Sequence, residues 1–133
     1  MDAQRLVDLA AIGFAVLMAG VVGFQLALAA GAPWGSYAMG GAFPGRYPPR
    51  MRVAAVVQAV LLAGLAVLVL SAAGILVPGL VEAWPWLAWV PVVVSVLAVI
   101  LNAASRSAGE RRIWVPVAVG LLVTSLIVAL GQI

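Results

Sequence analysis

The sequence contains no cysteine, no histidine and no lysine, and its seven basic residues are all arginines. Without cysteine and histidine the chain cannot form disulfides, Cys/His zinc sites, His-ligated haem or catalytic triads that use those residues. Only four carboxylates occur, and their spacing suggests no acid–base pair: Asp2, Asp8, Glu82 and Glu110. The sequence therefore predicts no catalytic residue, no metal site and no cofactor. It favours a protein that is not an enzyme but leaves the question open.

Charged residues of either sign are scarce. They make up 8% of the chain, whereas soluble domains carry about 25%. A fold of 133 residues that are 66% hydrophobic could not bury its apolar surface in water, because small domains have little interior. We infer that lipid surrounds most side chains. The net charge of +3 then indicates a fixed orientation and contact with anionic lipid headgroups, and not nucleic-acid binding.

Four long apolar stretches are present, at residues 9–32, 53–77, 84–101 and 113–131. Each can cross a hydrocarbon core of about 30 Å, and a chain segment isolated in lipid must be helical to satisfy its own backbone hydrogen bonds. The predicted fold is a single all-α domain over residues 1–133. It is a four-transmembrane-helix bundle with a long Gly/Pro/aromatic loop between helices 1 and 2. The expected helices span about 6–32, 52–77, 84–104 and 112–131.

These stretches allow two other interpretations. The segment Val90–Leu101 is as rich in β-branched residues as a buried strand, but it shows no alternation and has no partner strand. The triplet Ala27-Leu28-Ala29 resembles a signal-peptide cleavage site. However, the apolar stretch is too long, and the residues before it are not a basic cluster. We therefore expect a helix in the third stretch and a first span that is retained.

The arginines predict the orientation. Six of the seven lie in the first and third connections between spans: Arg46, Arg50, Arg52, Arg106, Arg111 and Arg112. Arginine-rich loops stay in the cytoplasm, so we expect a multi-pass protein of the cell (inner) membrane with both termini extracytoplasmic. Aromatic residues collect at both interfaces of a bilayer. The expected outer belt is Trp84, Trp86 and Trp89, and the expected inner belt is Trp34, Tyr37, Tyr47 and Trp114.

Small residues recur every four positions in the first two spans, at Ala15, Ala19, Gly23 and Ala27 and at Ala55, Ala59 and Ala63. Such stripes let helices approach closely in lipid. An alanine-rich composition also produces them without any contact. We expect the first and second spans to be neighbours through these stripes. The short connection at residues 78–83 predicts that the second and third spans are neighbours as well.

The loop at residues 31–50 is the most unusual segment, because it is about twenty residues long and rich in glycine, proline and aromatics. Loops of this length in a compact domain tend to be functional or disordered, and the aromatics argue against disorder. We expect it to fold back over the cytoplasmic end of the bundle. It matches no phosphate-binding fingerprint. A lid without a ligand is the simpler interpretation.

Three amides from three spans, Gln25, Gln58 and Asn102, should share the cytoplasmic third of the bundle. Gln58, for example, follows Arg52 by six residues, or about 9 Å of helix. The plainer interpretation is hydrogen bonding between helices. The functional one is a polar vestibule ringed by arginines and roofed by the loop, suited to an anionic or amphipathic ligand. The candidate ligand-binding residues are Gln25, Gln58, Asn102, Arg46, Arg50, Arg52, Trp34 and Tyr37. Orientation and contact with lipid phosphates explain the arginines equally well.

Several short motifs together resemble small four-helix integral membrane proteins of high-GC, actinobacterial-type bacteria. They are Gly31-Ala-Pro-Trp-Gly, Gly40-Gly41, Pro49-Arg-Met-Arg52, Asn102-Ala-Ala-Ser105 and Glu110-Arg-Arg-Ile-Trp-Val-Pro116. The resemblance covers most of the chain after residue 31. It implies the four-helix topology and adds no reaction.

Three functional hypotheses follow. The first is a non-enzymatic lipid-binding or membrane-assembly module, with membrane lipids, a second copy or a membrane protein as partner. The alternative is a small transporter or flippase for an amphipathic or anionic substrate that enters the cytoplasmic-side vestibule. The third is an enzyme for a lipid-borne substrate with Glu110 as its acid–base group. Glu110 beside Arg111 and Arg112 is more simply explained as a solvated loop pair.

Overall fold

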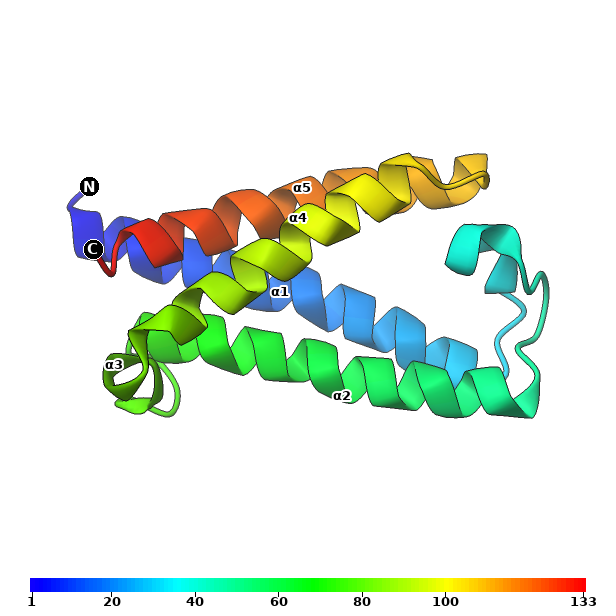
Figure 1. Ribbon diagram of the computed structural model, residues 1–133, viewed down its shortest axis with the longest axis horizontal. Helices are drawn as coiled ribbons and strands as arrows, with labels where there is room; N and C mark the ends of the chain where they lie inside the picture. The colour runs from blue at the N-terminus through cyan, green and yellow to red at the C-terminus, as the bar shows by residue number, and fades with distance from the viewer.

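The computed structural model describes residues 1–133 and contains only helices and connections (Figure 1). Four elements are long and apolar enough to cross a membrane. They are α1 (Ala3–Ala29), α2 (Pro49–Ala72), the segment Pro85–Ala103 and α5 (Ala108–Leu130). The third of these joins the 3-10 helix η3 (Pro85–Trp89) to α4 (Val90–Ala103). The predicted all-α bundle of four spans is confirmed, and the chain is a membrane-embedded helical protein.

The helix ends differ from the predicted ones because local capping decides them. Ser107 caps α5 and Asp2 caps α1, and each side chain accepts a hydrogen bond from the amide three residues later. At the other ends, α1 and α2 each terminate before a glycine with positive φ, Gly31 and Gly74. The residue after each glycine donates its amide to a carbonyl five positions back, which is the Schellman arrangement. The second helix therefore stops at residue 72 and not at 77.

Helix α1 lies at the centre of the packing, in contact with both α2 and α5, while α4 lies along α5 (Figure 1). The predicted pairing of the first and second spans is confirmed. The predicted pairing of the second and third spans holds only near the short helix α3 (Leu80–Ala83). There Val92 of α4 shares a core cluster with Leu68 and Ala72 of α2. Beyond that point α4 follows α5 and diverges from α2.

The buried face of α1 is not the predicted stripe of small residues. The core contains Val7, Ala11, Phe14 and Met18, which recur at intervals of three or four positions. Ala19 and Gly23 of the predicted stripe are exposed. On α2 the prediction is partly correct, because Ala55 and Ala59 are buried and Ala63 is exposed. These helices are apolar on every side. The positions of small side chains therefore could not show which face of α1 packs against its neighbours.

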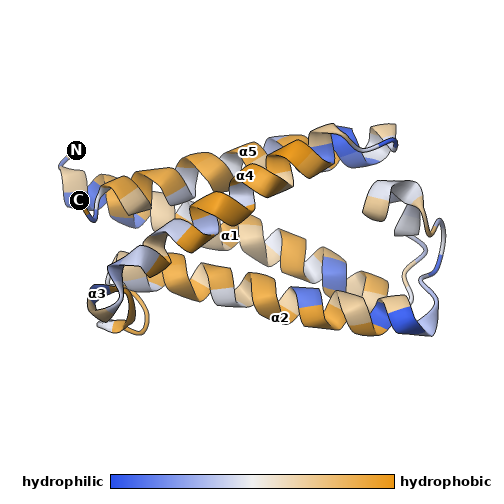
Figure 2. Ribbon diagram, viewed as in Figure 1, coloured by the Kyte–Doolittle hydropathy of each residue, from blue (hydrophilic) through white to orange (hydrophobic).

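Both termini lie at one end of the molecule, and the α1–α2 loop (residues 30–48) lies at the other with the α4–α5 connection (Figure 1). Six arginines lie in these two connections or at the starts of α2 and α5, so they share one end, which we call the arginine end. In Figure 2 the hydrophobic colours run along the middle of the four long helices, and blue segments gather at the arginine end. The side of the membrane that this end faces stays a prediction.

Candidate functional site

A cavity of about 610 Å³ lies between the four long helices toward the arginine end. Its volume falls in the range of about 300–1,000 Å³ that is usual for small-molecule sites. The lining comes from α1, α2, α4, α5, the α1–α2 loop and Ser105 of the α4–α5 connection. Because 17 of its 24 residues are hydrophobic, the cavity is a mostly apolar chamber with a few polar groups.

Helical periodicity builds the walls. α2 contributes Gln58, Leu62 and Leu65, and α5 contributes Glu110, Trp114, Val117, Ala118 and Leu121. Residues three, four and seven positions apart lie on one helix face, so each helix presents a polar group near the arginine end and apolar groups deeper in the bundle. From Gln58 to Leu65 the wall extends about 10 Å along the helix axis.

The three predicted amides all line this cavity. Asn102 donates from Nδ2 to the carbonyl of Ala98 in its own helix, at 2.7 Å. The side chains of Gln25 and Gln58 form no hydrogen bond within the chain. The interpretation of the three amides as hydrogen bonds between helices is therefore wrong. Because α4 diverges from α2, the amides face a common space and do not reach one another's helices.

The other candidate residues are divided between the lining and its surroundings. Tyr37 lines the cavity, but Trp34 and the three arginines of the first loop do not. Trp34 stacks on Phe24 with ring centroids 6.2 Å apart and nearly parallel planes. Arg52 donates from Nε to the carbonyl of Tyr47 at 2.9 Å, which holds the end of the loop against the start of α2. The arginine ring around the vestibule thus lies outside the chamber and does not contribute to its lining.

The α1–α2 loop forms the roof of the cavity, as the sequence predicts. Its 3-10 helices η1 (Gly35–Tyr37) and η2 (Met39–Gly41) lie against the start of α5. Ser107 Oγ donates to the carbonyl of Ser36 at 2.7 Å, and Trp114 Nε1 donates to that of Tyr37 at 2.9 Å. A Cβ at Gly109 would lie 2.5 Å from the Tyr37 ring, so a larger residue at this position would displace that ring.

Glu110 is buried, with 8% of its surface exposed, and it lines the cavity. Its Oε2 accepts hydrogen bonds from the Gly40 amide and from Ser105 Oγ, each at 2.8 Å. No arginine donates a hydrogen bond to it, and Arg111 donates instead to the carbonyl of Ser105. The interpretation of Glu110 as a solvated loop pair is wrong, because the loop covers it and the donors to its Oε2 are neutral groups and not an arginine.

Tyr47 was expected in the inner aromatic belt but is buried, with Leu28, Ala38 and Ala55 as its core neighbours. It also lines the cavity. Burial raises the pKa of the Tyr47 hydroxyl above its ordinary value, and the negative charge of Glu110 raises it further. Both effects keep this hydroxyl protonated and able to donate a hydrogen bond.

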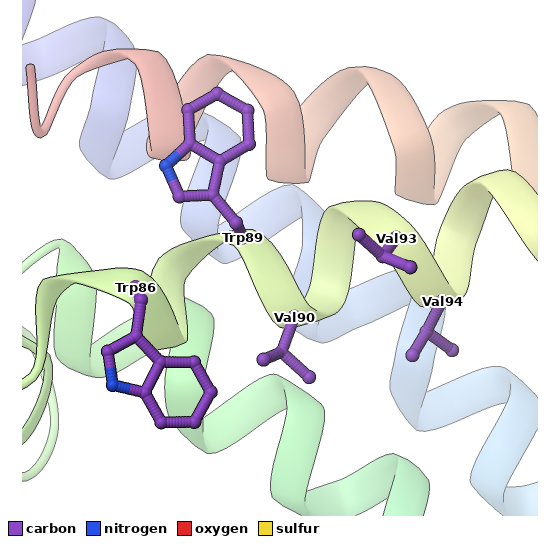
Figure 3. Close-up of a pocket in the computed structure, with 5 residues that line it drawn as sticks. All are labelled: Trp86, Trp89, Val90, Val93 and Val94. Carbon is purple, nitrogen blue, oxygen red and sulfur yellow. The ribbon is translucent and has the colours of Figure 1, made fainter.

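A second, shallower hollow of about 290 Å³ lies at the opposite end, lined by Trp86, Trp89, Val90, Val93 and Val94 (Figure 3). Figure 3 shows Trp86 and Trp89 projecting to opposite sides of the chain where η3 leads into α4. Every lining residue is hydrophobic, so this hollow offers a surface for hydrocarbon chains and no group for chemistry or for recognition of a polar ligand.

Sequence reasoning found the amides and missed Glu110 and Tyr47 as lining residues. One available signal was the pattern Ser107-x-x-Glu110, which is typical of a capped helix start and not of an open loop. For Tyr47 the sequence offered no comparable signal.

Comparison with known proteins assigns no family, since no family model, no curated protein and no solved structure matches the chain.

Proposed function

We propose that this protein is a membrane-embedded binding module for an amphipathic molecule, which occupies the cavity at the arginine end. The observation that carries the proposal is the pair of amides on Gln25 and Gln58, which line a mostly apolar chamber and have no hydrogen-bond partners within the chain. Polar groups inside a membrane protein usually face the interior and mark a site, because hydrocarbon offers them no partner.

The side of the cavity between α2 and α4 gives such a molecule a path. The two helices separate beyond the α3 end, and the lining residues on this side are exposed: Gln58, Leu97 and Leu101. Leu97 and Leu101 have 52% and 69% of their surfaces accessible. In a bilayer those surfaces would contact lipid, so the cavity would open within the plane of the membrane.

The polar and apolar parts of the lining are arranged in the order that an amphipathic molecule requires. Gln25, Gln58 and Asn102 lie toward the arginine end, and Met18, Leu65 and Leu121 lie deeper. A head placed among the amides lies near the headgroup level, and its chain extends toward the bilayer centre. This arrangement supports binding of a lipid or a lipid-like molecule.

Filling the cavity should prevent this binding. We expect Ala98→Phe, which projects an aromatic ring into the chamber from α4, to remove most co-purifying amphipathic ligand. Ala103→Phe places the same ring at an exposed position of α4 outside the lining and should leave the ligand in place. Native mass spectrometry of the protein extracted in mild detergent measures the occupancy. Thermal unfolding followed by helical circular dichroism shows whether both variants remain folded.

Equal occupancy in a folded Ala98→Phe variant and the wild type would contradict the proposal.

Transport of the same molecule is the second candidate function, and the opening of the cavity toward lipid favours it. The two differ in a flux assay with fluorescent lipid in proteoliposomes. A carrier accelerates movement of the probe between leaflets and loses that effect in Gln25→Leu or Gln58→Leu. A binding module does not accelerate it.

A further inference from the structure

The sign of the charge inside the cavity differs from what the arginine-rich loops suggest. Six arginines lie at this end of the molecule, yet none lines the chamber. Glu110 is the only charged residue among the 24 that do. A ligand held inside therefore meets one negative charge, and the positive charges lie outside the lining.

The acceptor capacity of this site is only partly used. Oε2 of Glu110 has two donors, the Gly40 amide and Ser105 Oγ, while Oε1 has no partner within the chain. The side-chain oxygens of Gln25 and Gln58 are likewise free, and that of Asn102 accepts nothing. A buried carboxylate without a cation is costly unless other groups compensate its charge. The amide nitrogens of Gln25 and Gln58 are equally free, so the cavity presents neutral donors, several acceptors and one carboxylate, and it lacks a cationic donor.

The arginines cannot supply that donor from where they lie. Arg111 is bound to the carbonyl of Ser105, and Arg52 is bound to that of Tyr47. The chain contains no lysine that could reach the site. A ligand that neutralises Glu110 would bring positive charge, and one with several N–H donors would also use the free acceptors, which describes an ammonium group.

We propose that the cavity selects amphipathic molecules with a primary ammonium head, which Glu110 binds through Oε1 while Gln25 and Gln58 accept its remaining hydrogens. This inference rests on the proposed function and specifies its ligand class. The head could belong to an aminophospholipid or to a free alkylammonium, which share this chemistry. Because Oε2 of Glu110 also binds the Gly40 amide, one carboxylate would hold both the ligand and the roof.

The test compares three head groups that are attached to the same dodecyl chain. Wild-type protein in dodecyl maltoside is titrated at neutral pH with dodecylammonium, dodecanol or dodecyltrimethylammonium, and the unfolding temperature is followed. We expect dodecylammonium to reach half-saturation at a concentration about tenfold below that of dodecanol, since it forms a charged hydrogen bond. Dodecyltrimethylammonium has the charge without N–H donors and should lie between them.

Glu110→Gln should abolish the preference for ammonium over alcohol, so that dodecylammonium and dodecanol reach half-saturation at the same concentration. Glu82→Gln is the matched control, because Glu82 is exposed near the opposite end, and it should keep the preference. If Glu110→Gln does not fold, the wild-type ranking of the three heads still decides the question. Equal half-saturation by dodecylammonium and dodecanol, or a preference that survives Glu110→Gln, would overturn the inference.

The source of the head is resolved in nanodiscs that contain phosphatidylethanolamine and phosphatidylglycerol in equal amounts. Retention of phosphatidylethanolamine in native mass spectra supports an aminophospholipid, and retention of added dodecylammonium alone supports a free amphiphile. Retention of phosphatidylglycerol in preference to both contradicts the inference. If Ala98→Phe abolishes binding of dodecanol, the proposed binding function is supported even when the preference for ammonium is absent. The proposed function and the proposed head-group selectivity can therefore fail independently.

Discussion

A single oxygen atom, Oε2 of Glu110, joins the start of α5 to two other segments. In an ordinary capping box the glutamate at the third helical position bonds directly to the amide of the N-cap residue. Here Ser105 intervenes, because its hydroxyl accepts from the Ser107 amide at 3.1 Å and donates to Glu110 at 2.8 Å. The Gly40 amide adds the α1–α2 loop to the same oxygen. Glu110 therefore caps a helix, orders a turn and anchors the roof.

The hydroxyl of Tyr47 reports the charge of Glu110. In a Tyr37→Phe background only Tyr47 titrates as a phenol, and tyrosinate absorbance in an alkaline titration gives its pKa. We expect a pKa above the ordinary value of about 10. Glu110→Gln should lower this pKa in part, because burial is the larger cause and persists. Glu82→Gln should leave it unchanged.

The sign of the linked stability follows from the same pKa. The folded state favours the neutral phenol, so this contribution to the free energy of unfolding is complete below pH about 10. It is lost as the pH rises through the raised pKa. A Tyr47 pKa at or below the ordinary value in the folded protein would contradict the burial of this side chain.

Among the elements, the α1–α2 loop depends on close backbone contacts. Gly35 donates its amide to the carbonyl of Gly45 at 2.9 Å, and a Cβ at Gly35 would lie 1.8 Å from the Phe43 carbonyl oxygen. No real Cβ tolerates that distance, and the obstructing atom belongs to the backbone. The two ends of the roof can approach each other only because residue 35 is glycine.

Gly35→Ala should therefore open the roof without unfolding the spans. Trypsin cleaves after arginine, so the rate of cleavage at Arg46 measures the opening, and mass spectrometry identifies the fragments. A loss of about 1.4 kcal/mol in loop docking raises the open population about tenfold, and we expect cleavage at Arg46 at least this much faster. Gly64→Ala is the control, because nothing lies within 4 Å of its Cβ, and it should match the wild type. Cleavage at the wild-type rate in Gly35→Ala would contradict the close contact.

The sequence predicted the elements better than their contacts, for a physical reason. Hydrocarbon thickness and backbone hydrogen bonding determine where a span can lie, so four spans and three amides at similar depth could be inferred from helix rise. Which helices pack together was harder to predict, because the sequence of a helix that is apolar on every side carries little information about which face is buried. The burial of Glu110 depends on Gly40, a contact across 70 positions of the chain that local sequence does not encode.

At the scale of the whole molecule, charge is distributed unevenly between the two ends. Six arginines and Glu110 lie at the arginine end. Asp2, Arg5 and Asp8 belong to the start of α1 and Glu82 belongs to α3, and both of these segments lie at the end with the termini (Figure 1). This arrangement is the basis for a cytoplasmic arginine end. With the predicted orientation, the cavity would open toward the cytoplasmic leaflet.

The lack of cysteine makes this orientation directly measurable. Ala42→Cys places a thiol in the α1–α2 loop, and Gln132→Cys places one near the C-terminus, both at exposed positions. In intact cells we expect a membrane-impermeant maleimide to label Gln132→Cys and to label Ala42→Cys only after the membrane is permeabilised. The cysteine-free parent is the background control. The reverse pattern would invert the topology, and labelling of both variants in intact cells would show that the protein inserts in two orientations.

The separation of α2 from α4 has a consequence for affinity. A molecule that reaches its site sideways first dissolves in the bilayer, which concentrates it far above its level in water. Each methylene added to the chain improves that partitioning by about 0.8 kcal/mol, or about fourfold. Apparent affinity referred to the aqueous phase would then increase with chain length even if the protein made no further contact. The bilayer would supply most of the binding strength, and discrimination would be left to the few polar atoms around Glu110.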